Sequence, residues 1–169
     1  MVKQKTDKKL LTKREVKILL RLIDEGYSKA AWHGANLRGS LRGVDARKAL
    51  WRSGNGRPRI WDLVLHLAHS KYLTWRRTVG NKDEKFPRDA AGSNYWYEIP
   101  SVATEAAWRK DLKLLADYHE KARKAVVELE SRSMPHSFDL LLHRINGCAM
   151  HDIYHAGQIQ LIKKLNSGK

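Results

Sequence analysis

Cysteine is nearly absent from this chain, since Cys148 is the only one among 169 residues. A single cysteine excludes both an intramolecular disulfide and a metal site built from several thiolates. Long apolar runs are also absent: none approaches the ~18 residues of a membrane span, and the N-terminus lacks the apolar segment of a signal peptide. We therefore expect a cytoplasmic protein that does not contact a membrane.

The composition is that of a soluble globular protein, with 42% hydrophobic and 30% charged residues in a chain of single-domain length. The net charge of +15 is unevenly distributed. Residues 28–60 contain eight lysines and arginines but only one acidic residue, Asp45. Such a segment favours an anionic partner, either nucleic acid or a small carboxylate or phosphate, although basic clusters are also typical of solvated faces.

Four long segments show helical periodicity, and no useful stretch alternates as a strand does. The first begins at Thr12, where Glu15 completes a capping box. The other three cover about residues 60–79, 104–130 and 137–165. The fourth is apolar over most of its circumference, so we expect it to be the most buried helix.

This pattern predicts an all-α fold, a four-helix bundle with a long crossover between the second and third helices. The crossover, residues 80–100, has no clear period and includes the aromatic run 95–97. We expect a flexible basic N-terminus over residues 1–11 and one bundle domain over residues 12–166.

Two histidines lie on one face of the fourth helix. His151 and His155 are four residues apart, which places them about 40° apart on the helical wheel. Two imidazoles arranged in this way form half of a zinc, nickel or iron site, although two hydrogen-bonded core histidines would have the same spacing.

A third ligand has to come from another helix, and the second helix offers His66 at the margin of its apolar stripe. His69 lies almost opposite that stripe, so we expect it to point away from the interior. His143 is a weaker candidate because it lies about 80° from His151 on the wheel. We expect His119 and His136 to be surface residues.

Other histidine motifs fit less well. In residues 151–155, Asp152 replaces the glutamate of a zinc protease motif, and neither a histidine nor an acidic residue follows His155. No glutamate is followed by histidine at the spacing of a di-iron bundle. A three-histidine site of His66, His151 and His155 remains the best interpretation.

Four segments are similar to motifs of a known family: residues 31–34, 60–67, 106–112 and, most specifically, 151–159. The chain resembles the DinB-like superfamily of metal-binding four-helix bundles, which includes bacillithiol- and mycothiol-dependent transferases. The resemblance extends over about residues 19–165. It implies that His66, His151 and His155 bind a divalent metal and that the protein pairs as a homodimer. It implies no particular substrate.

A three-histidine site leaves at least one coordination position open. A divalent metal bound there would activate a thiol or a water molecule. Zinc and nickel are the preferred metals, and iron is the next candidate. We therefore expect a metal-dependent S-transferase or hydrolase, with a low-molecular-weight thiol as a possible cofactor. The alternatives are a non-catalytic basic module that binds nucleic acid or another anion, for which no motif is present, and a metal-stabilised scaffold without activity.

Several further residues have more than one interpretation. His33 is a candidate general base or substrate contact, and otherwise a structural histidine. Asp152 is a weak candidate for an acceptor that orients a ligand, while Cys148 is expected to be a core cysteine. The aromatic run 95–97 could close over the site or lie at a dimer interface.

Overall fold

The computed structural model describes residues 10–80, 83–88, 96–133 and 137–168. Within these residues the regular structure is helical, apart from isolated bridge residues at Ala31, Gly34 and Tyr97. The long helices are α1 (Lys13–Tyr27), α4 (Ile60–Val79), α5 (Glu105–Val127) and α6 (Phe138–Ser167). The short ones are α2 (Leu37–Ser40), α3 (Ala46–Leu50) and the 3₁₀ turn η1 (Glu128–Glu130). The all-α prediction is confirmed.

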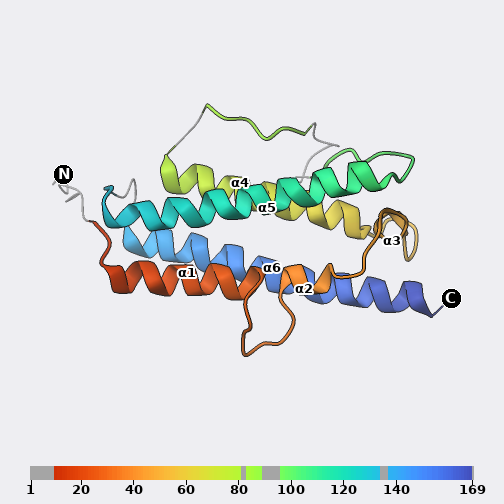
Figure 1. Cartoon of the computed structure of the whole chain (residues 1–169), viewed down its shortest axis with the longest axis horizontal. Coiled ribbons are helices and arrows are strands. Elements are labelled where there is room, and N and C mark those ends of the chain that lie inside the picture. Colours follow the sequence, from red (N-terminus) through yellow and green to blue (C-terminus); the bar gives the residue numbers. More distant parts are fainter. Residues whose placement is uncertain (1–9, 81–82, 89–95, 134–136, 169) are drawn as a thin grey trace.

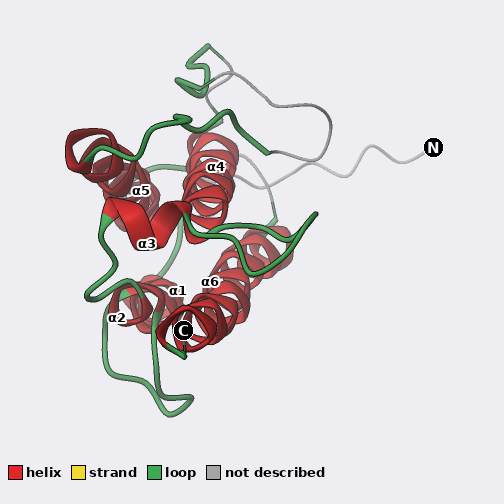
Figure 2. Cartoon of the chain, turned by 90° about the vertical axis from the view of Figure 1, so that its right-hand side faces the viewer, coloured by secondary structure: helices red, strands yellow, loops and turns green. Residues whose placement is uncertain are grey.

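The four long helices lie side by side along the length of the molecule (Figure 1). Helix α4 packs against α5 and α6, and α1 packs against α6 and α5. Viewed from the end, α1, α2 and α5 lie on one side of the molecule, and α4 and α6 on the other (Figure 2). Because α4 and α5 run in the same direction, the chain between them returns along their length (Figure 1).

The helix ends follow signals in the sequence. At the start of α1, the Glu15 amide donates to Thr12 Oγ1 at 3.2 Å and the Thr12 amide donates to Glu15 Oε2 at 2.8 Å, so the predicted capping box is present. Helix α4 ends at Gly80, whose φ of 72° lies in the left-handed region that glycine adopts without strain.

The most buried long helix is α4 rather than α6, so that prediction was wrong. Twelve of the 20 residues of α4 are buried, compared with nine of the 30 residues of α6. Helix α6 instead has one exposed apolar face. Its large exposed apolar side chains are Leu140, Met150, Tyr154, Leu161 and Leu165.

The N-terminal prediction falls mostly outside the described residues, which begin at Leu10. Leu11, which the sequence analysis assigns to the flexible segment, is buried, and its amide donates to the carbonyl oxygen of Leu129 at 3.0 Å. None of the helices in the described part of the chain is long and apolar enough to cross a membrane.

Candidate metal centre

The imidazoles of His66, His151 and His155 converge between α4 and α6. His151 Nε2 lies 3.1 Å from His66 Nε2 and 2.9 Å from His155 Nε2. One ligand atom from each histidine lies within 4.8 Å of the other two. Three nitrogens around one tetrahedral zinc would be ~3.3 Å apart, given zinc–nitrogen bonds of about 2.0–2.1 Å. These three histidines could therefore hold a metal ion.

Hydrogen bonding accounts less well for the same geometry. The Nε2 atom of His151 is close to two other Nε2 atoms. A ring nitrogen either carries one proton or offers one lone pair, so it cannot make a good hydrogen bond to both neighbours. Three nitrogens that direct lone pairs at one cation face no such conflict. The chemistry of this donor set therefore fits a divalent metal.

Gln158 fixes the orientation of one imidazole. The Nδ1 atom of His155 lies 2.7 Å from Gln158 Oε1, and the Gln158 amide nitrogen donates to the hydroxyl of Tyr154 at 3.0 Å. The Oε1 atom is only an acceptor, so it selects the tautomer of His155 with the proton on Nδ1. The lone pair of this ring then lies on Nε2, where the three histidines meet.

Burial favours the neutral form of the two histidines on α6. It lowers the pKa of His151 to about 4, helped by the neighbouring His155, His66 and Lys71. Burial also lowers the pKa of His155, partly offset by the hydrogen bond to Gln158. Because only neutral imidazole binds a metal, these shifts favour the metal-binding form of His151 and His155.

The segment after α4 covers one side of the cluster. The indole of Trp96 stacks on the imidazole of His66, with ring centroids 5.0 Å apart and planes inclined by 24°. Trp96, one residue of the aromatic run 95–97, therefore contacts one histidine of the cluster. Tyr95 lies outside the described residues.

A basic cavity adjoins the cluster through Trp96. It has a volume of about 310 Å³, and its polar lining consists mainly of Arg52, Arg57, Arg59 and Asp62. Asp62 lies one turn before His66 on α4 and binds the Arg59 guanidinium at 3.0 and 3.1 Å. The Arg57 side chain has no acidic partner among the described residues. Three arginines of the basic segment 28–60 thus line a cavity that shares Trp96 with the histidine cluster.

The other candidate histidines lie apart from the cluster. His33 is exposed in the turn at residues 31–34, and His143 is exposed on α6. His69 does not join the cluster, as expected, but it is buried because the rings of Phe86 and Tyr97 cover it, with centroids 5.1 and 5.4 Å from its own. Burial lowers its pKa to about 4.

His119 also differs from its prediction as a surface residue. It is only 2% exposed, and its ring stacks on Tyr27 with centroids 3.7 Å apart. It does not reach the histidine cluster. His136 lies outside the described residues.

Asp152 does not orient a histidine, so the weak assignment made from sequence was wrong. Its Oδ2 atom accepts from Lys71 Nζ at 2.5 Å, and both side chains are almost fully buried between α4 and α6. Burial alone would lower the pKa of Lys71, but the carboxylate outweighs it and the pKa is raised. Cys148 is buried beside this pair, as expected of a core cysteine, and burial raises the pKa of its thiol.

Sequence reasoning found the three histidines but missed Gln158 as a hydrogen-bond partner and Trp96 as a stacking partner. Gln158 lies three residues after His155, which was a usable signal. No comparable signal exists for Trp96, because its contact with His66 depends on the path of an aperiodic segment. Comparison with protein-family models, curated proteins and solved structures found no match.

Proposed function

We propose that this protein is a divalent-metal-dependent enzyme whose metal is held by His66, His151 and His155. The observation that carries the proposal is the convergence of three Nε2 atoms, one of which is oriented by Gln158. Zinc and nickel are the metals that suit such a site best, and iron is the next candidate. When bound, the metal would act as a Lewis acid on a thiol or a water molecule.

We propose further that the fold is a DinB-like four-helix bundle. The packing of α4 against α5 and α6, and of α1 against α6 and α5, supports this, as does the long return between the parallel helices α4 and α5 (Figure 1). The sequence resemblance in residues 151–159 falls on the part of α6 that carries two of the three histidines.

The basic cavity favours thiol transfer over hydrolysis. Its arginines would bind the carboxylates of a low-molecular-weight thiol, as guanidinium groups bind carboxylates well. In such a reaction the sulfur forms a bond to an electrophilic carbon, the leaving group departs with its bonding electron pair, and the thiol proton passes to solvent. Arg57, which has no acidic partner, would position the thiol.

Activity measurements with metal-loaded protein test this function. Mercaptosuccinate, a thiol with two carboxylates, should be alkylated by an electrophile faster than 2-mercaptoethanol, and Arg57→Gln should reduce this preference. Arg47→Gln, on α3 and outside the cavity, is the matched control. Hydrolysis of an activated ester without thiol transfer would instead identify a hydrolase. Loaded protein inert in both assays would contradict an enzymatic role.

We also propose that two copies pair through the exposed apolar face of α6. This face consists of Leu140, Met150, Tyr154, Leu161 and Leu165, and exposed patches of this kind commonly mark interaction sites. Sedimentation analysis should give a dimer for the wild type and a monomer for Leu161→Glu. Val102→Glu, at an exposed position outside α6, should remain dimeric.

A further inference from the structure

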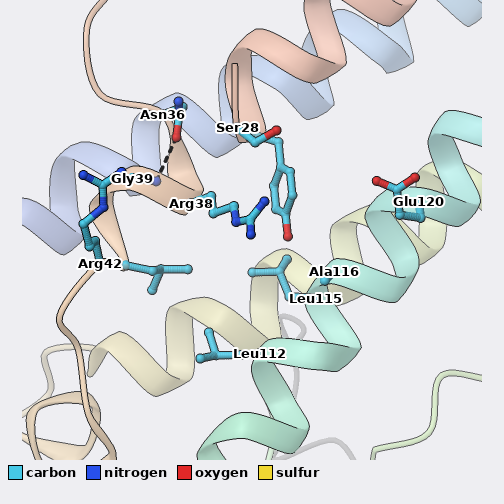
Figure 3. A pocket seen from close by; sticks show the side chains of 11 residues that line it. Ser28, Asn36, Arg38, Gly39, Arg42, Leu112, Leu115, Ala116 and Glu120 are labelled. Atoms are coloured by element: carbon cyan, nitrogen blue, oxygen red, sulfur yellow. Dashed lines mark hydrogen bonds between the residues drawn. The ribbon is translucent and has the colours of Figure 1, made fainter. Parts of the chain in front are cut away.

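A larger cavity opens on the side of the molecule away from the histidine cluster. It has a volume of about 690 Å³ and lies between α1, α2 and α5 (Figure 3). Its volume is within the range of about 300–1,000 Å³ typical of small-molecule sites. None of the three histidines lines it, so any ligand there occupies a separate site.

The α2 side of this cavity carries unopposed positive charge. Neither Arg38 nor Arg42 has an acidic partner among the described residues, although both line the cavity. The Arg38 side chain extends from α2 toward α5 (Figure 3). A third cation lies behind them, since Lys163 Nζ donates to the backbone carbonyl oxygens of Ser40 and Arg42 at 2.9 and 2.7 Å. An anion in this cavity would relieve the mutual repulsion of these groups.

A tyrosine side chain also lines the cavity. Tyr27 lines it and is only 8% exposed, yet its hydroxyl has no hydrogen-bond partner among the described residues. The ring is held in place by its stack on His119, and Lys71 Nζ lies 5.0 Å from the ring centroid. The hydroxyl is therefore available to donate a hydrogen bond to an oxygen atom of a ligand.

The opposite wall determines what kind of anion fits. It consists of the apolar side chains Leu112, Leu115 and Ala116 of α5, which continue toward Glu120 (Figure 3). An apolar wall favours a ligand with a hydrocarbon body. The Glu120 carboxylate disfavours a second negative charge, and therefore disfavours a phosphate dianion.

We propose that this cavity binds a small organic carboxylate. Its anionic group would lie beside Arg38, with Arg42 adding positive charge at the cavity wall, and accept a hydrogen bond from the Tyr27 hydroxyl. Its apolar body would lie against Leu112 and Leu115. The site is independent of the proposed metal-dependent activity.

Isothermal titration of the full-length protein tests the site, with 4-phenylbutyrate and octanoate as probes. Each should bind with a Kd below about 1 mM. The double variant Arg38→Gln/Arg42→Gln should weaken binding about tenfold or more, because hydrogen bonds to charged groups contribute about 1.5–3 kcal/mol each. Tyr27→Phe keeps the ring and should weaken binding about three- to tenfold. Arg47→Gln and His66→Ala are controls that should bind normally.

Three results would overturn the proposal. The first is that neither carboxylate binds at millimolar concentration. The second is that 4-phenylbutylamine or inorganic phosphate binds as tightly as 4-phenylbutyrate. The third is that His66→Ala weakens binding while the arginine double variant does not, which would place the ligand at the histidine cluster.

Discussion

At the residue scale, Gln158 decides which nitrogen of His155 carries the proton. Replacing it with leucine removes the acceptor 2.7 Å from Nδ1 and frees the ring to change tautomer or rotate. Loss of such an outer partner typically reduces metal affinity about 10- to 100-fold. Zinc titration of Gln158→Leu should show this loss. Gln160→Leu, at an exposed position on the same helix, should bind zinc like the wild type, and equal affinities for both variants would contradict the assigned role.

His119 makes the folded protein sensitive to acid. Burial, with contributions from Lys71 and Arg123, lowers its pKa from 6.5 to about 3. As the pH falls below 6.5, the unfolded chain takes up a proton at this position while the folded chain does not, so stability is lost as the pH falls from 6.5 toward 3.

The variant His119→Phe keeps an aromatic ring beside Tyr27 but cannot titrate. Between about pH 7 and about pH 5, metal-free wild-type protein should lose about 2 kcal/mol more unfolding free energy than metal-free His119→Phe. Urea denaturation at the two pH values measures this difference. Parallel losses in the two proteins would show that His119 is protonated in the folded state.

The residues of the histidine cluster were predictable because their positions depend on helix geometry alone. The spacing of His151 and His155 fixes their common face, and the apolar stripe of α4 places His66 at its margin. The burial of His69 and His119 was not predictable in this way. It depends on Tyr97 and Tyr27, which come from other parts of the chain.

At the element scale, α1 and α6 approach each other closely at Gly26. A Cβ atom at this position would lie 2.9 Å from the backbone carbonyl oxygen of Ala149, which cannot move without shifting α6. Gly26→Ala should therefore lower the unfolding free energy by about 1–3 kcal/mol. At Gly147, on the exposed side of α6, a Cβ would have nothing within 4 Å, so Gly147→Ala should stabilise by about 0.5–1 kcal/mol. Chemical denaturation of both variants distinguishes the two cases, and equal effects would refute the close approach.

The ion pair between Lys71 and Asp152 joins α4 to α6 inside the protein. Lys71→Met would leave a buried carboxylate without its partner, which typically costs about 3–5 kcal/mol. The double variant Lys71→Met/Asp152→Leu removes both charges and should unfold within about 1 kcal/mol of the wild type. Denaturant unfolding of the two variants checks this. A double variant as unstable as the single one would show that the pair itself, not the unpaired charge, determines stability.

Helix boundaries were predictable where the sequence carries strong local signals. The predicted range 60–79 matches α4, and Thr12 caps α1 as expected. Helix α2 was missed because four residues show no periodicity. The burial of α6 was overestimated because its apolar residues are spread over the helix, and composition alone does not show which face packs against α1 and α4.

At the scale of the whole molecule, the basic segment 28–60 contributes arginines to the lining of two separate cavities. Arg38 and Arg42 line the cavity between α1, α2 and α5, while Arg52, Arg57 and Arg59 line the cavity beside Trp96. The sequence indicated an anionic partner from the charge alone. The division of that charge between two cavities follows from packing, which the charge pattern does not encode.

The central claim is that three histidines from two helices bind one metal ion, and metal content measured by elemental analysis tests it most directly. Purified untagged wild-type protein and the exposed-position control His143→Ala should each contain about one equivalent of metal, and His66→Ala and His151→Ala should contain none. Equal metal content in all four proteins would contradict the assignment. So would wild-type protein that contains no metal and binds none of added zinc, nickel or iron.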